Sequence, residues 1–514
     1  MPAVLFVLLA LIAAVVVVAG VVLARAVAFR PPGAPAQDTP DFDPGPARAE
    51  ELERLGAALR IPTVSHADYE ATDFAPFAAF KEFLAASFPL FHERCELEVV
   101  NGYALIYRWP GVGETRGTGR EGDGEDAGGD DGIGHRGGAL DPVALMAHYD
   151  VVPVEEGAGE EWRQPPFSGA VVDGVVWGRG ALDVKSQLMA HLEAAESLMR
   201  AGFAPRRDVY FCYGHDEETG GQQGAAKVVE HFAGRGVRFA GVLDEGGMVI
   251  RGALAGVGAP LGLIGMAEKG LSNYRFKVEG AGGHSSTPLK NTSLGLAAQL
   301  ITLIERRPMP LRLIAPVEAM LRNVAGEMGF GTRLVMANLW LFRPLLVRKL
   351  AADPTTNAMV RTTFAVTMAS ASDAANVLPQ TSRFVVNVRI LPGDTTEDVR
   401  RHFAGLIART GFPAVAEPLL ETEPSPASRP GSDFYRSIEQ LIHEFYPSAL
   451  VTPYVMVGGT DARRFHALSE NVLRFTPFHL TGEDLGRLHN ANESLSWANY
   501  GRMIAFYESL LRQQ

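Results

Sequence analysis

Cysteine is almost absent from this sequence: Cys95 and Cys212 are the only two in 514 residues, and they do not form a CxxC pair. A disulfide framework and a cysteine-rich zinc site are therefore excluded, and any metal must be held by His, Asp and Glu. Basic residues are also few, 47 against 59 acidic ones, and the net charge of -12 argues against a nucleic-acid partner. No GxSxG motif lies between a strand and a helix, which disfavours a serine hydrolase.

The length and composition indicate a mostly soluble chain with more than one domain. A chain of 514 residues exceeds a single compact core. Hydrophobic residues make up 47% and charged residues 21%. These proportions fit neither wholesale disorder nor a polytopic membrane protein.

No charged residue interrupts positions 3–24, where every residue is apolar or glycine. About 20 such residues cross a bilayer as a helix. A cleaved signal peptide usually has a shorter apolar core, of about 7 to 15 residues, and a basic front, whereas the first basic residue here is Arg25. We expect an uncleaved transmembrane anchor over 3–24, with a signal peptide as the alternative. Arg25 and Arg30 weakly favour a cytoplasmic body and leave the membrane side open.

Two stretches lack the pattern of a helix or strand. Residues 30–47 are rich in proline and are expected to be a linker between the membrane and the folded body. Residues 111–138 mix glycines with charged residues and have no apolar period, which predicts a flexible insertion.

Three short hydrophobic runs each end in side chains that bind metals. Helical stretches near 186–201 and 222–232 separate the runs, and this alternation predicts a parallel sheet covered by helices. In such a sheet the ligand crevice lies beyond the carboxyl ends of the strands. The runs and their endings are Val143–Ala147 before His148-Tyr149-Asp150, Val209–Tyr213 before Gly214-His215-Asp216-Glu217-Glu218, and Gly241–Leu243 before Asp244-Glu245-Gly246.

Two polar turns add further candidate ligands. Glycines at 178 and 180 permit a tight turn that delivers Asp183 just before a helix, and His489 lies in a late polar turn. Two His, two Asp and one Glu suit zinc or another divalent first-row ion such as Co²⁺ or Mn²⁺. The three carboxylates and one hydroxide would balance two divalent ions, so we expect two per subunit. The predicted ligands are His148, Asp183, Glu218, Asp244 and His489, with Asp183 as the bridge between the ions.

The remaining carboxylates near these ligands suggest a hydrolytic reaction. Asp150 lies two residues after His148 and can accept the second N–H of its imidazole, which would fix the tautomer. Glu217 is adjacent to the predicted ligand Glu218 but is not needed as a ligand. It could take a proton from a bridging water and pass it to a leaving nitrogen.

These motifs, in this order, resemble the co-catalytic zinc peptidase family that includes carboxypeptidase S, glutamate carboxypeptidase, aminoacylase-1 and secreted N-acyl amino acid hydrolases. The resemblance runs from about Glu50 to the C-terminus, and the forms at 214–218 and 243–247 look most like the carboxypeptidase S branch. One departure is Val184, where that branch commonly has a second Asp. The resemblance implies cleavage of the amide bond of a small peptide or N-acyl amino acid that carries a free carboxylate.

The family fold supplies an architecture for the whole chain. We expect an α/β catalytic domain with a mostly parallel sheet, interrupted by a smaller α+β lid or dimerisation domain and preceded by the transmembrane helix. Alternating residues at 272–279 and 383–390, followed by glycine turns and helical stretches, support such a lid. The predicted boundaries are 48–267 and 419–514 for the catalytic domain and 268–418 for the lid.

The resemblance also assigns residues outside the metal site. His284 would help to hold the tetrahedral oxyanion, reaching the neighbouring subunit across a homodimer formed by the lids. Asn376 and Arg389 resemble positions that bind the substrate near its carboxylate, to which the planar guanidinium of an arginine is suited. Gly459 and Thr460 belong to a loop whose backbone N–H groups would meet the same end of the substrate.

Residues 306–362 form an apolar insertion that the smaller relatives lack. Its most apolar part, 334–347, contains Trp340 and Phe342. The ordinary interpretation is a helix packed on the lid or in a dimer interface. Two sharper hypotheses are a channel for a long acyl group and a surface that rests on the bilayer beside the anchor.

The sequence is compatible with three functional interpretations. The main hypothesis is a dinuclear zinc amide hydrolase. A strict dipeptidase, rather than a deacylase, would have the same residues. A non-catalytic binding protein could keep the fold, but loss of Glu217 or Asp183 would signal it, and both are present.

Overall fold

The computed structural model describes residues 2–30, 42–43, 45, 48–113, 140–154, 161–254 and 256–514. Most of the predicted linker at 30–47 and of the insertion at 111–138 lies outside these residues. The chain forms two compact units. The lid unit comprises Met1–Ala34, Ala267–Ala427 and Pro453–Gly459, and the core unit comprises Pro35–Met266, Ser428–Thr452 and Thr460–Gln514.

The sheet of the core unit is mixed, with parallel strands at its centre. Its strand order is β1-β2-β6-β3-β7-β17-β9-β8-β18. The pairs β6–β3, β3–β7 and β7–β17 are parallel, whereas β1–β2 and β2–β6 are antiparallel. The strands are β1 (Glu96–Val100), β2 (Ala104–Trp109), β3 (Val143–His148), β6 (Val209–Gly214), β7 (Gly241–Asp244), β8 (Val249–Arg251), β9 (Leu261–Glu268), β17 (Val472–Arg474) and β18 (His479–Thr481).

Alternation along the central strands gives this sheet two apolar faces. In β3, Leu145 packs in one hydrophobic cluster and its neighbours Ala144 and Met146 pack in another. Side chains of a strand point alternately to opposite faces, so a strand buried on both sides is apolar throughout. All six residues of β3 and of β6 are buried.

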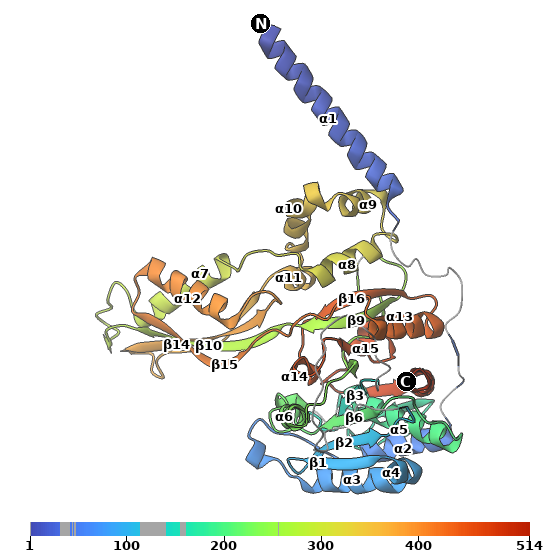
Figure 1. Cartoon of the computed structure of the whole chain (residues 1–514). Helices are drawn as coiled ribbons and strands as arrows, with labels where there is room; N and C mark the ends of the chain where they lie inside the picture. Colours follow the sequence, from blue (N-terminus) through green and yellow to red (C-terminus); the bar gives the residue numbers. More distant parts are fainter. Residues whose placement is uncertain are drawn as a thin grey trace, which may run out of the picture. The chain divides into compact units, whose positions relative to one another are not determined.

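Helices supply the partners for both faces (Figure 1). The larger cluster includes residues of α2, α3, α5, α13 and α16, and the smaller one includes residues of α6 and α14. The helices of the core unit are α2 (Ala49–Leu59), α3 (Ala75–Ser87), α4 (Pro89–Arg94), α5 (Lys185–Arg200), α6 (Ala225–Gly234), α13 (Asp433–Phe445), α14 (Ala462–Phe465), α15 (Gly482–Leu485) and α16 (Trp497–Arg512). A small sheet β19-β5-β4 consists of β19 (Ser494–Ser496), β5 (Val175–Trp177) and β4 (Ala170–Val172).

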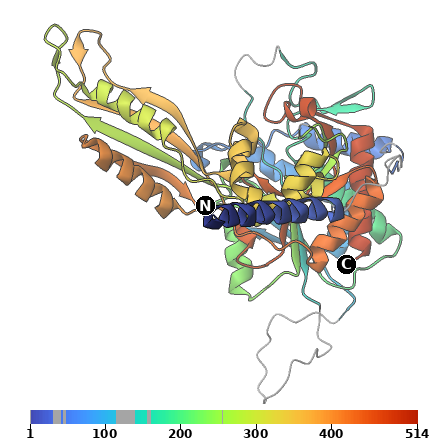
Figure 2. The ribbon, with the colours of Figure 1, turned by 90° about the horizontal axis from the view of Figure 1, so that it is seen from above.

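The lid unit contains a separate antiparallel sheet in the order β12-β14-β10-β15. Two helices, α7 and α12, cover one of its faces (Figure 2), where Phe276 and Phe384 stack with their ring centroids 4.7 Å apart. The elements are β10 (Gly270–Glu279), α7 (Ser293–Arg306), β12 (Thr363–Ser370), β14 (Thr381–Ile390), α12 (Thr396–Thr410) and β15 (Ala414–Thr422). The predicted fold class, a mostly parallel α/β sheet with a separate α+β lid, is confirmed.

The apolar insertion at 306–362 folds as four helices with a hydrophobic cluster of their own. These are α8 (Ala315–Val324), α9 (Phe330–Ala337), α10 (Leu339–Leu350) and α11 (Pro354–Val360). The N-terminal segment forms one long helix, α1 (Pro2–Ala28). By length and composition α1 could cross a membrane, but a signal sequence near the N-terminus would meet the same criteria.

Candidate metal centre

Polar side chains from the strand ends and turns of the core unit converge as the topology predicts. His148 is the last residue of β3, and Glu217 and Glu218 begin a short 3₁₀ helix, η3 (Glu217–Thr219), after β6. Asp183 precedes α5 and is joined to Val184 by a cis peptide bond. His489 lies in a turn with a left-handed φ of 59°.

Asp183 lies between two groups of candidate ligands. Its Oδ1 is 3.0 Å from Nε2 of His148, and its Oδ2 is 3.0 Å from Nε2 of His489. Glu218 Oε2 is 3.2 Å from the same nitrogen of His489. The first group is completed by Glu245, whose Oε1 is 3.2 Å from His148 Nε2. In each group the candidate ligand atoms lie within 4.8 Å of one another.

Charge concentration in this cluster shifts the pKa values of its members. Hydrogen bonds to Asp183 and Glu218 raise the pKa of His489 to about 10. Although burial opposes its ionisation, hydrogen bonds from His148 and His489 lower the pKa of Asp183. Burial raises the pKa of Glu218, and the charge of Asp183 adds to this effect. The arrangement therefore concentrates negative charge that a cation would neutralise.

The predicted ligand Asp244 is not part of either group, whereas its neighbour Glu245 is part of the first. Asp244 Oδ2 accepts a hydrogen bond from the backbone N–H of Ala462 at 2.8 Å, and Oδ1 accepts one from the N–H of Glu245. Asp244 instead holds the start of α14, directly after the predicted substrate loop at Gly459 and Thr460.

Asp150 connects His148 with the segment that carries the two glutamates. Nδ1 of His148 lies 3.0 Å from the backbone carbonyl oxygen of Asp150 and 3.3 Å from its Oδ1. Because a carbonyl oxygen only accepts, Nδ1 carries the proton and Nε2 is left to bind a metal. The carboxylate of Asp150 accepts hydrogen bonds from the N–H groups of Glu217 and Glu218, both at 3.2 Å, and from Ser65 at 2.7 Å.

Glu493 is a positioning residue whose side chain the sequence did not predict. It is fully buried, and its Oε1 accepts hydrogen bonds from the backbone N–H groups of Gly180, Leu182 and Asp183 at 3.0, 2.7 and 3.1 Å. Its Oε2 pairs with Arg179 at 2.7 Å. One carboxylate thus fixes the whole turn that presents Asp183. A buried charge needs such partners. The position of Glu493 in the sequence, just after His489, does not reveal which groups they are.

Glu217 lies beside the two groups without belonging to either. Its Oε2 is 4.0 Å from His148 Nε2. Burial raises the pKa of Glu217 well above its usual range, even though the nearby His148 lowers it. A carboxyl group with a raised pKa can both accept and release a proton near neutral pH.

The other predicted site residues belong to the lid unit, apart from Thr460 in the core unit. His284 lies on β11 (Gly283–His284), which pairs with β13 (Val377–Leu378), and the N–H of Ser285 donates to the carbonyl oxygen of Asn376 at 3.1 Å. His284 and Asn376 therefore lie together. Arg389 pairs with Leu271 near the opposite end of β14. At the rise of an extended strand, about 26 Å separates Arg389 from the first residue of β14.

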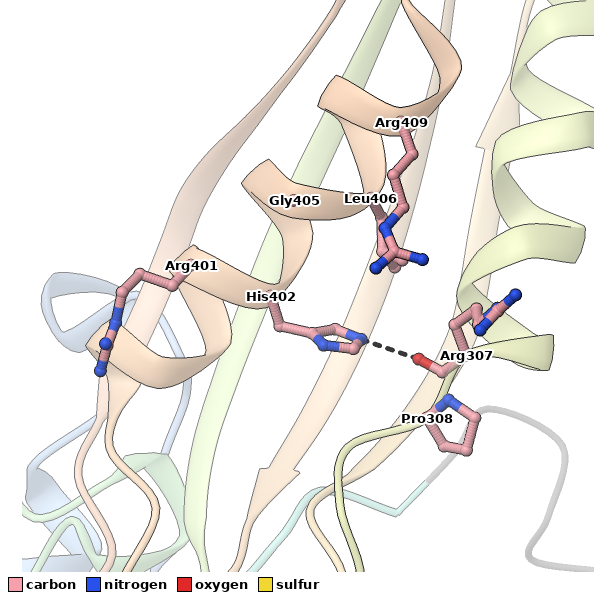
Figure 3. A pocket seen from close by; sticks show the side chains of 7 residues that line it. All are labelled: Arg307, Pro308, Arg401, His402, Gly405, Leu406 and Arg409. Atoms are coloured by element: carbon pink, nitrogen blue, oxygen red, sulfur yellow. Dashed lines mark hydrogen bonds between the residues drawn. The ribbon is translucent and has the colours of Figure 1, made fainter.

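Neither of two hollows in the lid unit is lined by a predicted site residue. One, of about 370 Å³, lies between the end of α7 and α12, where His402 Nε2 is 2.7 Å from the carbonyl oxygen of Arg307 (Figure 3). The other, of about 620 Å³, is lined by β12, β14 and neighbouring strands. Neither contains a set of side chains that could carry the predicted chemistry.

Residues 144–513 match the model of peptidase family M20/M25/M40. The chain belongs to this family. It is 33% identical over 469 residues to probable carboxypeptidase S-like 2 of Dictyostelium discoideum, covering 90% of this chain and 85% of that one. It is 34% identical over 469 residues to the N-fatty-acyl-amino acid synthase/hydrolase PM20D1 of Xenopus tropicalis, covering 90% and 86%. The resemblance read from the motifs is confirmed.

A solved structure agrees with the fold. The M20 family metallo-carboxypeptidase Sso-CP2 from Sulfolobus solfataricus superposes with a TM-score of 0.62 at 18% identity, over 90% of this chain and 99% of that one. The protein is thus an M20 metallopeptidase or amidohydrolase, and the family implies metal ions. The residues fit this cofactor: imidazoles and carboxylates suit divalent cations, and the buried Oε1 of Glu218 has no hydrogen-bond partner.

Proposed function

We propose that the protein is a dinuclear zinc hydrolase that cleaves the amide bond of small peptides or N-acyl amino acids with a free carboxylate. The observation that carries this proposal is the position of Asp183, whose two oxygens face two separate ligand groups. Such a carboxylate can bridge two ions about 3.5 to 4 Å apart. Zinc suits the set of imidazoles and carboxylates, although Co²⁺ or Mn²⁺ could occupy it.

The ligands divide into two sets around the bridge. His148 and Glu245 would hold one ion and Glu218 and His489 the other, with Asp183 shared by both. When bound, the ions would polarise the substrate carbonyl and lower the pKa of a water molecule. Asp150 keeps the proton of His148 on Nδ1 and holds the backbone of the two glutamates.

Glu217 is the proposed general base. It lies next to a ligand, is outside both ligand groups, and has a raised pKa. It would take the proton of the attacking water and pass it to the leaving amine nitrogen, so the proton never has to leave the site. Glu217→Gln should keep both ions and lose activity by several orders of magnitude, since only the proton acceptor is removed. Retained activity would contradict this role.

Substrate recognition is proposed to depend on the carboxylate. Arg389 would pair with it bidentately, and the loop with Gly459 and Thr460 would donate backbone N–H groups. Two relatives bear names of different reactions, a probable carboxypeptidase and an N-fatty-acyl-amino acid synthase/hydrolase. A panel of dipeptides and N-acyl amino acids with short and long chains, assayed with zinc-loaded enzyme, would separate peptidase from deacylase activity. No turnover of any of them would refute the proposed function.

His284 is proposed to stabilise the oxyanion in the partner subunit of a homodimer. The N–H of Ser286 donates to its Nδ1 at 3.1 Å, so a neutral ring carries its proton on Nε2 and can donate it. A small substrate cannot contact His284 and Arg389 of the same chain if the length of β14 separates them. In a homodimer, the substrate of one subunit could contact Arg389 of that subunit and His284 of the partner subunit.

A mixing experiment tests the dimer. The His284→Ala and Glu217→Gln variants would each be inactive alone. Mixed subunits would contain one complete site in each hybrid dimer, so activity should return to about a quarter of the wild-type value. No recovery after verified subunit exchange would mean that His284 acts in its own chain or not at all.

The helix α1 is proposed to remain as a membrane anchor. It is long enough to cross a bilayer, and Val22 and Ala26 near its end are buried against the lid unit. Mass spectrometry of the chain purified from membranes would find residues 2–28 present. A chain that begins after Ala28 would contradict the proposal.

A further inference from the structure

The last turns of α1 are packed against α9 and against Asn338, the residue that joins α9 to α10. Arg25 Nε donates a hydrogen bond to the carbonyl oxygen of Ala337 at 3.0 Å. Asn338 Nδ2 donates to the carbonyl oxygen of Val22, also at 3.0 Å, and the Asn338 side chain is fully buried. Ala26 of α1 is buried completely. A polar side chain buried between two helices fixes their relative position, because breaking its hydrogen bonds would leave it unpaired.

This contact places α9 and the start of α10 where the membrane surface would be. The 27 residues of α1 extend about 40 Å, and the hydrocarbon core of a bilayer is about 30 Å thick. The charged Arg25 ends the apolar stretch, so the turns around it would lie at the level of the lipid headgroups. These are the turns that contact Ala337 and Asn338 (Figure 1).

Large apolar side chains of α9 and α10 are exposed. We define the α9–α10 surface by Phe330, Trp340, Leu341 and Leu345, which are 50%, 58%, 42% and 62% exposed. Such a concentration of exposed apolar groups on two adjacent helices indicates a binding surface. A tryptophan is the residue type that concentrates at the membrane interface, since its ring is apolar and its N–H is polar.

The charged residues of α9 and α10 are all of one sign. Residues 330–350 contain four basic residues and no acidic residue, in a chain with a net charge of -12. Arg343 pairs with Glu318 of α8. A basic, apolar helix beside a membrane anchor is attracted to anionic lipid. The other basic residues are Arg333, Arg348 and Lys349.

We propose that the α9–α10 surface lies in the headgroup region of a bilayer that contains anionic lipid, as a second membrane contact beside α1. The apolar side chains would enter the lipid, and the basic residues would meet the lipid phosphates and carboxylates. The proposal rests on the retention of α1 as an anchor and is independent of the hydrolytic reaction. A single helix would allow the lid unit to rotate about the axis of α1. Attachment by both α1 and the α9–α10 surface would restrict this rotation.

Quenching by brominated lipids tests the proposal on the full chain reconstituted in phosphatidylcholine vesicles, with and without phosphatidylserine. Brominated acyl chains quench only tryptophans that reach the lipid. The emission of the wild type should be quenched, more strongly with phosphatidylserine, and Trp340→Phe should remove the quenched component. Trp497→Phe is the matched control, because Trp497 is 45% exposed but lies in the core unit. It should leave the quenching unchanged.

A second pair of variants tests the apolar contact without altering a tryptophan. Leu345→Glu should reduce the quenching of Trp340, whereas Leu294→Glu, at a 51% exposed position of α7, should not. Equal quenching in the wild type and Trp340→Phe, or none in either, would overturn the proposal. A blue-shifted Trp340 emission that brominated lipid leaves unchanged would overturn it in favour of coverage by a second copy. Intact mass measured on the same sample reports separately whether α1 is retained.

Discussion

Substitution of Glu493 by Gln should weaken metal binding. Glu493 contacts the candidate ligand Asp183 only at its backbone N–H. Its carboxylate accepts three N–H groups of the turn that presents Asp183 and pairs with the buried Arg179. An amide of the same shape keeps one acceptor oxygen, loses the negative charge and leaves the guanidinium without its counter-ion. Asp183 would then be held less firmly between His148 and His489.

The magnitude follows from the kind of contact that is lost. Residues that orient metal ligands typically change metal affinity by about 10- to 100-fold when they are replaced. Removal of one partner of a buried ion pair destabilises a protein by about 3 to 5 kcal/mol. We therefore expect a zinc affinity at least about 10-fold lower and faster amide exchange in residues 179–184.

The assay is competition for zinc with a chromophoric chelator, together with hydrogen–deuterium exchange of the metal-free protein. Glu98→Gln is the control, because Glu98 pairs with Arg235 on the surface, where an ion pair contributes little. Wild-type zinc affinity and wild-type exchange at 179–184 in Glu493→Gln would refute the reasoning.

Three further predictions concern other parts of the molecule. Glu245→Gln should reduce zinc from two ions to one per subunit, while Asp244→Asn should retain two, as measured by metal analysis after dialysis; the reverse result would restore Asp244 as the ligand. Asp150→Asn should lower zinc affinity about 10- to 100-fold. The substitution removes the negative charge beside His148 and at the backbone N–H groups of Glu217 and Glu218. Unchanged affinity would contradict this role of Asp150. Burial lowers the pKa of His191 to about 3, against 6.5 when unfolded. The unfolded chain therefore binds a proton that the folded chain excludes, and stability falls below pH 6.5 by up to about 1.4 kcal/mol per pH unit. In chelator-treated protein, His191→Leu should flatten the dependence of the denaturation midpoint between pH 7 and 5, and an unchanged slope would refute this.

The central strands and the candidate ligands at their ends were predictable, because each signal is local. The apolar run Val143–Ala147 ends directly at His148, and β3 ends at that residue. The glycine turn before Asp183 requires the positive φ of 89° at Gly180. The order of strands and helices then brings these ends to one edge of the sheet.

The choice between Asp244 and Glu245 was not predictable by the same means. The two carboxylates are adjacent in the sequence, and both can ligate a metal. In the structure Asp244 Oδ2 accepts a hydrogen bond from the N–H of Ala462, more than 200 residues away in the sequence, and the local pattern does not reveal such a contact. The contact between α1 and Asn338 is equally non-local, and no sequence pattern in either segment predicts it.

The central claim is that two metal ions share Asp183, and anomalous diffraction from crystals of the zinc-loaded enzyme tests it most directly. We predict two zinc peaks about 3.5 to 4 Å apart, one among His148, Asp183 and Glu245 and the other among Asp183, Glu218 and His489. A single peak, or two peaks without Asp183 between them, would contradict the account.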